Sequence, residues 1–545
     1  MQASHQLKNA AIARHSSELM RLSRLGSAFP TRLSFMRVLL RDLAVEGVKV
    51  TRPRWDINED GHGQAVYSLT CGKHTYSLVA ISTPLADKDR SDRVIAEAWD
   101  AAFVLYDGIP SKKEVERIAL SAPHQEACRY SEKELTLSRA NKSGRLFKEV
   151  VDALSNGRQP DAQMIGQIGY LMRTTAVYGN GKFGISDRDR FADRQNMTKP
   201  FQAEMLTVWL VRAFTHDLVE HIAAARSTHA VKLDRHLKRY LGIGNATGLG
   251  MAPFLVSHPQ LLNAWATARE HALVRVLNST RDIGQALEEK ASQVQKHLNA
   301  WNVDDHRQME RIEKLREEFS MLDLNVQTWA SLWHQTEDLS FECQELVQAI
   351  LIDLNPELVD DLAEELGSNL PLAWHPEETV NKLLSDIENK YSWALGYDFS
   401  SRKETALFWY TSEEKLEPRL GRRFEEPGAE KERPLDIARQ VQSLYSMLQT
   451  ADPDQKLAFF FVENPSHRAI AARIQTCRDL PFAEIQDNLI AETTLPIDML
   501  RFKLAMFGAN KFDPKSDLWT RITLFQGAPL IDDDDLGADW SFAVL

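Results

Sequence analysis

The chain has 545 residues, of which 43% are hydrophobic and 26% are charged, and its formal net charge at pH 7 is −12. This length predicts about two to four domains, and the composition is ordinary for a globular protein that buries large cores. The acidic balance argues against a nucleic-acid partner, because binding to phosphate groups needs a basic surface.

The four cysteines, Cys71, Cys128, Cys343 and Cys477, lie too far apart for a metal knuckle or a redox pair. Such isolated cysteines are typical of reduced, buried thiols. The N-terminal stretch up to Leu25 is polar and lacks an apolar segment, and no run of about 18 apolar residues occurs. We therefore expect a cytoplasmic protein without a membrane partner.

In the first third of the chain, residues 1–29 are expected to form a helical arm. Helical spacing then alternates with two runs rich in β-forming residues, which predicts a hairpin among helices. The expected elements are a helix over 30–47, a hairpin of strands 65–69 and 75–81, and helices over 91–106, 131–154 and 161–177.

The middle of the chain, residues 201–366, shows helical periodicity with few strand-forming runs. Within it, apolar residues from Met309 to Leu322 recur at heptad-like spacing. That run predicts a long helix of a bundle, with a coiled hairpin as the alternative.

A glycine-rich stretch, residues 239–253, carries four glycines within nine residues. Pro253 is expected in the first turn of a following helix, and a glycine-rich loop that enters a helix N-terminus is a ready anion site. No Gly-Lys-Ser/Thr follows and no strand is expected before it, which excludes a phosphate loop and a dinucleotide fingerprint. The alternative is a tight turn whose glycines serve only close packing.

The second half of the chain repeats the order of elements in the first half. Tyr397 matches Trp55 at a shift of 342 (397 − 55), and Tyr445 falls opposite Phe103 at the same shift (445 − 103). Residues 405–410 match the first hairpin. We predict an internal duplication; the alternative is that αβ units of similar length resemble one another.

The predicted fold class is α+β and mainly helical, with two similar small α+β units that flank a central helical bundle. The predicted domains are an N-terminal arm (1–29), a first α+β repeat (30–198), a central helical domain (199–368), a second repeat (369–520) and an acidic, apolar tail docked on the body (521–545).

A first polar cluster follows the helix predicted over 161–177. Arg173 can bind a carboxylate or phosphate with two parallel hydrogen bonds, and Lys182 adds a point charge. Tyr178, Asn180 and the neighbouring glycines permit a sharp turn whose N–H groups point together. The alternative is a loop of solvated charges.

A second cluster lies on the helix predicted from Phe201, which is apolar on most of its surface and therefore expected to be buried. A stripe at every fourth position contains Arg212, His216 and Glu220. His216 and Glu220 are one turn apart and could exchange a proton, since the pKa of histidine lies near neutrality. Their spacing does not match a zinc-hydrolase motif, and a buried ion-pair stripe is the alternative.

A third cluster, residues 138–145, contains three cations, among them Lys142, and can attract an anionic ligand in an acidic protein. The alternative is a solvated helix face.

These clusters together predict a cytosolic enzyme that acts on a small anionic metabolite, bearing a carboxylate or a phosphate, by proton-transfer, lyase or hydrolase chemistry. The expected catalytic residues are His216, Glu220 and Tyr178. The expected substrate-binding residues are Arg173, Asn180, Lys182, Arg212, Lys142, Asn245, Thr247, Gly248 and Gly250.

The alternative function is a non-catalytic scaffold or regulatory protein built from the duplicated module. The enzyme would be favoured if four of these residues converge in one pocket, namely Arg173, Lys182, His216 and Asn245. Their separation would favour the scaffold. The sequence predicts no metal site, specifies no cofactor and leaves a homodimer open.

Overall fold

The computed structural model describes residues 11–86, 98–124, 131–178, 193–194, 197–248, 259–280, 284–367, 372–398, 434–481, 484–485, 498–509, 511–516 and 519–545. The chain divides into two compact units. Unit 1 comprises Met1–Ala28, Leu249–Asp282 and Gln327–Lys503, and unit 2 comprises Phe29–Gly248, Ile283–Val326 and Leu504–Leu545.

Unit 2 contains a nine-stranded sheet with the order β1-β2-β3-β4-β5-β6-β7-β9-β8. All neighbouring strands pair antiparallel except β6 and β7, which run parallel. The strands are β1 (Val50–Ile57), β2 (Gly63–Cys71), β3 (His74–Ser82), β4 (Ala101–Asp107), β5 (Glu134–Lys142), β6 (Tyr170–Tyr178), β7 (Gly242–Gly248), β8 (Phe512–Ser516) and β9 (Trp519–Leu524).

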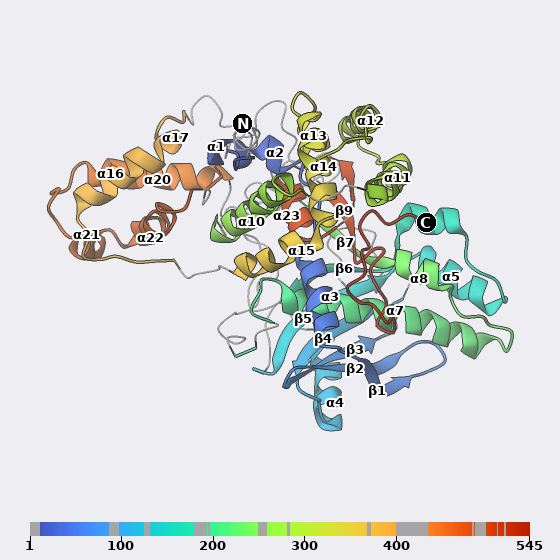
Figure 1. The fold of residues 1–545 in the computed structure, drawn as a ribbon. Helices are drawn as coiled ribbons and strands as arrows, with labels where there is room; N and C mark the ends of the chain where they lie inside the picture. Colours follow the sequence, from blue (N-terminus) through green and yellow to red (C-terminus); the bar gives the residue numbers. More distant parts are fainter. Residues whose placement is uncertain are drawn as a thin grey trace. The chain divides into compact units, whose positions relative to one another are not determined.

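The long helix α7 (Gln202–Arg226) packs across one face of this sheet (Figure 1). On that face the ring of Phe103 lies 5.7 Å from the ring of Phe214, and the hydroxyl of Thr136 hydrogen-bonds that of Thr207. Successive side chains of a strand point to opposite faces, so Val104 points away from α7. It joins a buried cluster with Ile118 of α4 (Lys112–Ser121) on the other face.

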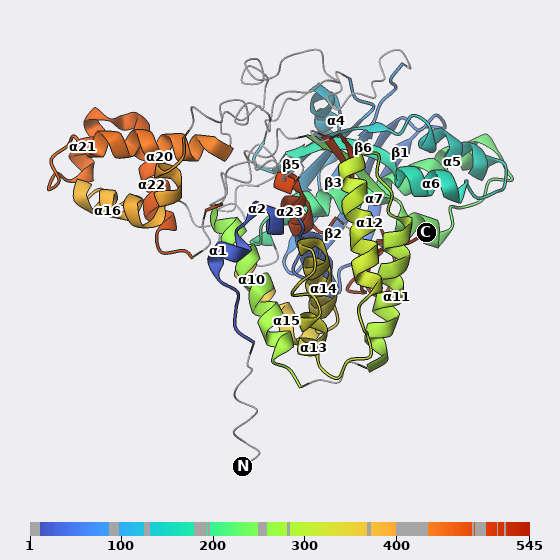
Figure 2. The ribbon, with the colours of Figure 1, turned by 90° about the horizontal axis from the view of Figure 1, so that it is seen from above.

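The remaining helices of unit 2 follow their sequence signals. α4 begins with a capping box, in which the Ser111 side chain accepts from the backbone of Glu114 and the Glu114 side chain accepts from Ser111. α11 and α12 lie side by side (Figure 2). These helices are α3 (Phe35–Val45), α5 (Leu146–Ser155), α6 (Ala162–Ile168), α8 (Arg235–Tyr240), α11 (Gly284–Ala300) and α12 (His306–Ser320).

The elements described in unit 1 are helices, apart from an isolated β-bridge between Thr379 and Lys456. Helix α10 contacts α13, α14, α15 and the 3-10 helix η7, and α14 also contacts α2. α16, α20 and α22 contact one another in a second group that includes α17. The helices are α1 (Ser16–Leu19), α2 (Leu22–Leu25), α10 (Pro259–Leu277), α13 (Trp329–His334), α14 (Phe341–Asp353), α15 (Pro356–Val359), η7 (Asp360–Gly367), α16 (Val380–Lys390), α17 (Ser392–Leu395), α20 (Pro434–Leu448), α21 (Leu457–Glu463), η10 (Pro465–His467) and α22 (Arg468–Cys477), with α23 (Asp498–Phe507) at the boundary of the unit.

The mixed helix and sheet content agrees with the predicted α+β class, and the hairpin at 65–81 is confirmed as β2 and β3. The helices predicted over 91–106, 131–154 and 161–177 are wrong in part, because strands β4, β5 and β6 occupy much of these ranges. β4 is buried on both faces, so its apolar residues do not alternate with polar ones and resemble a buried helix. The glycine-rich stretch is strand β7 rather than a loop, which corrects the expected turn over 242–248.

The internal duplication is not confirmed. Tyr445 lies in helix α20, whereas its proposed counterpart Phe103 lies in strand β4. The second hairpin, at 405–410, falls outside the described residues. The predicted domain boundaries stay a prediction, and so does the central bundle.

Among the helices that the structure describes, none is long and apolar enough to cross a membrane.

Candidate anion-binding site

Arg212, expected to bind substrate, lies buried in unit 2 and donates to main-chain carbonyls. Its Nε donates to Leu241 at 2.8 Å, and its two Nη atoms donate to the carbonyls of Lys238, Arg239, Ala528 and Pro529 at 2.7–3.0 Å. Burial and the charge of Arg239 lower its pKa to about 9, so the guanidinium stays charged at neutral pH. The described contacts of Arg212 therefore hold two chain segments together.

His216 and Glu220, the expected proton-transfer pair, are engaged with α8 and its surroundings. Burial, followed by the charges of Arg212 and Lys238, holds the pKa of His216 well below its ordinary value, so the imidazole is neutral. The carboxylate of Glu220 pairs with Nζ of Lys238 at 2.6 Å and accepts from the backbone N–H of Leu233 at 2.9 Å. These contacts fit the alternative of a paired polar stripe on the helix.

Arg173 does not lie on the same side of the sheet as His216. The neighbour of Arg173 in β6, Met172, accepts a hydrogen bond on its sulfur from Thr215 of α7 at 3.7 Å. Since adjacent side chains in a strand point to opposite faces, Arg173 points away from α7, which carries His216. The structure therefore does not bring these two residues together.

The other predicted site residues are placed only in part. Lys142, at the end of β5, pairs with Met172 in the sheet, and its backbone N–H donates to Asp100. The backbones of Tyr178, Asn245, Thr247 and Gly248 belong to β6 and β7. Asn180, Lys182 and Gly250 lie outside the described residues.

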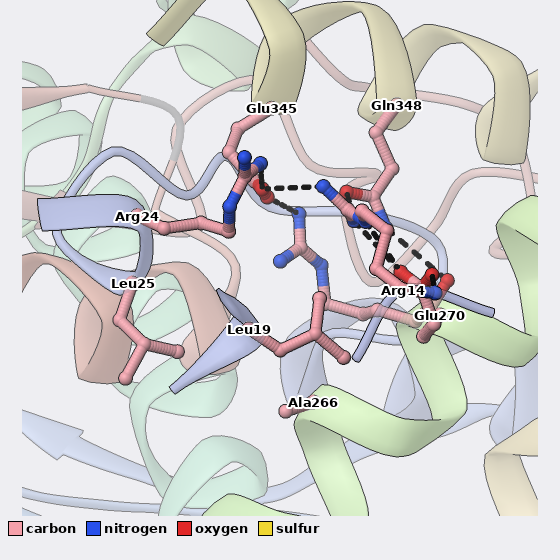
Figure 3. Close-up of a pocket in the computed structure, with 9 residues that line it drawn as sticks. Arg14, Leu19, Arg24, Leu25, Ala266, Glu270, Glu345 and Gln348 are labelled. Carbon is pink, nitrogen blue, oxygen red and sulfur yellow. Dashed lines mark hydrogen bonds and ion pairs between the residues drawn. The ribbon is translucent and has the colours of Figure 1, made fainter. Parts of the chain in front are cut away.

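A recess in unit 1 gathers charges that the sequence analysis did not connect (Figure 3). Its enclosed cavity volume is about 10 Å³, room for about one water molecule, within a wider space of about 260 Å³ that includes open solvent. Arg14 and Arg24 reach it from the N-terminal segment, Arg269 and Glu270 from α10, and Glu345 and Gln348 from α14. Leu19, Leu25 and Ala266 form its apolar lining. We call it the three-arginine recess.

Glu345 is the centre of the three-arginine recess. One carboxylate oxygen lies 3.2 Å from Nη1 of Arg24 and 3.7 Å from Nη1 of Arg14, and the other lies 3.0 Å from Nη2 of Arg269. All of these groups come from α14, α10 and the N-terminal segment, which are distant in sequence (Figure 3). One carboxylate therefore holds three segments together.

Further contacts orient two of the guanidinium groups. Arg14 donates to both oxygens of Glu270, through its backbone N–H at 2.6 Å and its Nη2 at 2.7 Å, and Nη2 also donates to Gln348. Nη2 of Arg24 donates to Gln344 at 2.9 Å.

An aromatic ring lies beneath each of the three guanidinium groups. Trp333, Phe341 and Trp265 lie under Arg14, Arg24 and Arg269, with 4.3–5.3 Å from the guanidinium carbon to the ring centroid. Such stacking holds the planar groups in place without using their N–H donors.

Electrostatics keep the recess charged. Burial raises the pKa of Glu345, but the charges of Arg269, Arg14 and Arg24 outweigh it, so the pKa lies below the ordinary glutamate value. Burial lowers the pKa of Arg269 and of Arg24, and Glu345 opposes this. Three arginines against the carboxylates of Glu270 and Glu345 leave the lining with a net charge of +1 (3 − 2).

Among the buried donors of the recess that make no hydrogen bond to a described residue are Nη1 of Arg14 and Nε of Arg24. A buried donor without an acceptor costs free energy, and an anion of matching geometry would remove that cost. The lining contains no Ser, Cys or His that could act as a nucleophile, and no metal-binding group of three His, Cys, Asp or Glu occurs among the residues described.

The sequence held one clue to the recess. Glu345 and the pair Arg269–Glu270 interrupt helices whose other positions are largely apolar, and charges at such positions are buried and paired. The arginine partners of Glu345 in the N-terminal segment could not be found in this way, because Arg24 and Glu345 are 321 residues apart.

Comparisons with protein-family models, with curated proteins and with solved structures found no match to this chain.

Proposed function

We propose that this protein binds a small anionic metabolite, with a carboxylate or a phosphate group, in the three-arginine recess. The class of ligand is the one expected from the sequence, whereas the residues that bind it are different. The observation that carries the proposal is that buried guanidinium donors on Arg14 and Arg24 make no hydrogen bond to a described residue, in a lining with more arginines than carboxylates.

Arginine suits this role because its fork of N–H groups matches carboxylate and phosphate oxygens. Glu345 and Gln348 occupy some of the donors and fix the directions of the others. A ligand would thus meet guanidinium groups that are already oriented, which reduces the entropic cost of binding.

The proposal is one of binding, and the lyase or hydrolase chemistry expected from the sequence stays a prediction. The pKa of Glu345 lies below its ordinary value, so this carboxylate is a weak base near neutrality. A proton-transfer group would have to come from elsewhere in the chain.

A scaffold or regulatory role is the second candidate. Each arginine of the recess has a carboxylate partner, as in an ion-pair cluster that serves only to join segments. The separation of Arg173 from His216 by the sheet also favours it.

Isothermal titration calorimetry with acetate, succinate, phosphate and sulfate, each at constant ionic strength, tests the proposal. We expect at least one of these anions to bind the wild-type chain. Arg269→Lys should weaken that binding at least tenfold, because lysine cannot reproduce the bidentate contact of arginine. Arg275→Lys is the matched control on α10; Arg275 pairs with Asp361 at the surface and should leave binding unchanged.

Absence of binding by all four anions to the wild-type chain would overturn the proposal. Equal binding by Arg269→Lys and Arg275→Lys would also overturn it, since the anion would then lie elsewhere. Circular dichroism at the titration temperature verifies that both variants are folded.

A further inference from the structure

The N-terminal segment 11–28, here called the arm, depends on docking for its structure. Its helices α1 and α2 contain four residues each. Helices this short are unstable in isolation, because nucleation costs more than one turn returns. Burial of Leu19, Met20, Leu22 and Leu25 against the rest of unit 1 therefore holds the arm in this conformation.

The arm supplies two of the three arginines of the recess, and each of these two has a buried guanidinium donor that makes no hydrogen bond to a described residue. The helices α10 and α14 supply Arg269, Glu270 and Glu345. An anion bound in the recess would thus contact both the arm and the helix pair.

Docking of the arm removes the excess negative charge at this place. With the arm docked, three arginines face Glu270, Glu345 and Glu18, which pairs with Arg24, so the net charge is 0 (3 − 3). Without the arm, Arg269 faces Glu270 and Glu345, a net charge of −1 (1 − 2). The helix pair alone would repel an anion, whereas the complete recess presents two further guanidinium groups to it.

We propose that the arm is an anion-dependent latch: the ligand binds only when the arm is docked, and ligand binding in turn fastens the arm. This inference rests on the proposed function. A ligand that binds one of two states multiplies the equilibrium ratio of that state to the other by 1 + [L]/Kd, and the coupling is reciprocal. The concentration of the anion would then set the fraction of molecules with an exposed arm.

Hydrogen exchange of the full chain, followed by mass spectrometry of peptides from residues 11–28, tests this inference. The probe is the anion with the highest affinity in the calorimetric series, applied at about 100 times its Kd. We expect exchange in the arm to slow by up to about 100-fold. Peptides from α16 and α20 serve as internal controls and should not change.

A second measurement weakens the arm without altering the charges of the recess. Leu22 is buried in the arm but does not line the recess, and Leu22→Ala should lower anion affinity because less of the chain has the arm docked. Leu457→Ala is the matched control: it truncates an equally buried leucine of unit 1, in α21, and should leave the affinity unchanged.

The outcomes separate the two proposals. Anion binding with unchanged exchange in the arm, or with equal affinity in Leu22→Ala and wild type, overturns the latch and leaves the proposed function standing. Absence of anion binding overturns both. Slower exchange in the arm together with weaker binding by Leu22→Ala alone supports the latch.

Discussion

Glu345 is a buried carboxylate that keeps its charge because arginines from two parts of the chain converge on it. Taking a carboxylate out of water costs several kcal/mol, and the surrounding guanidinium groups offset that cost only if all of them remain in place. Loss of one partner leaves the others as uncompensated buried charges.

Replacement of Glu345 by glutamine, which has nearly the same shape, should therefore lower the free energy of unfolding by about 3–5 kcal/mol at pH 7. Urea unfolding followed by circular dichroism measures this change. Glu365→Gln is the control, because Glu365 is exposed and pairs with His271 at the surface; it should change stability by less than about 0.5 kcal/mol.

The same variant should show a defined pH dependence. The pKa of Glu345 is lower in the folded chain than in the unfolded chain, so its stabilising effect is complete above the ordinary value of about 4.3. The effect is lost as the pH falls through the folded-state value. The stability gap between Glu345→Gln and wild type should narrow below about pH 4, and a gap that is constant from pH 7 to 3 would contradict this assignment.

Arg212 and His216 illustrate how a pattern can predict position without predicting role. Their four-residue spacing on a largely apolar helix indicated buried polar groups, and both are buried. The sequence could not show that carbonyls of residues 238–241 and 528–529 surround Arg212, because these acceptors belong to the main chain and lie up to 317 residues away.

At the scale of elements, strand β7 shows why its glycines are needed. A Cβ on Gly244 would lie 2.6 Å from the ring of Tyr170, and a Cβ on Gly242 would lie 2.3 Å from the carbonyl oxygen of Leu524. Close packing in a tight turn was the alternative to an anion-binding loop for these glycines, and the close approach found here is between neighbouring strands.

Gly244→Ala should lower the free energy of unfolding by about 1–3 kcal/mol, because the Tyr170 ring must move. Tyr170→Ala should make Gly244→Ala less costly, a coupling that a double-mutant cycle measures. Gly144→Ala is the control, since a Cβ there meets nothing within 4 Å. Additive effects of the two substitutions at 170 and 244 would show that the contact is not limiting.

The elements that could be predicted are those with strong local signals in residue type. The hairpin β2–β3 and helix α7 were located from residue types and periodicity. Strand β4 was assigned to a helix because packing on both faces removes alternation. The three-arginine recess could not be predicted as a whole, since its parts come from residues 14–24, 269–270 and 345–348 and meet only in the folded chain.

At the scale of the whole molecule, the two units alternate along the chain. The chain passes from one unit to the other at five points, after residues 28, 248, 282, 326 and 503. Neither unit is a continuous segment, so neither could be recognised from a boundary in composition.

A fragment of residues 29–326 should therefore fail to fold. It lacks β8 and β9, which leaves the edge of β7 unpaired, and it lacks the carbonyls of Ala528 and Pro529 that Arg212 contacts. We expect no cooperative thermal transition by circular dichroism. Co-expression with residues 504–545 should recover a transition, and cooperative unfolding of the fragment alone would refute the prediction.

The pairing of β7 with β9 also has a consequence for biosynthesis. Gly248 leaves the ribosome 271 residues before its partner Trp519 (519 − 248). At translation rates of about 5–20 residues per second, that interval lasts roughly 15–55 s. During this time the nascent sheet presents an open strand edge that can pair with other polypeptides. The yield of native protein in the cell should thus depend on how well that edge is shielded until the last strand emerges.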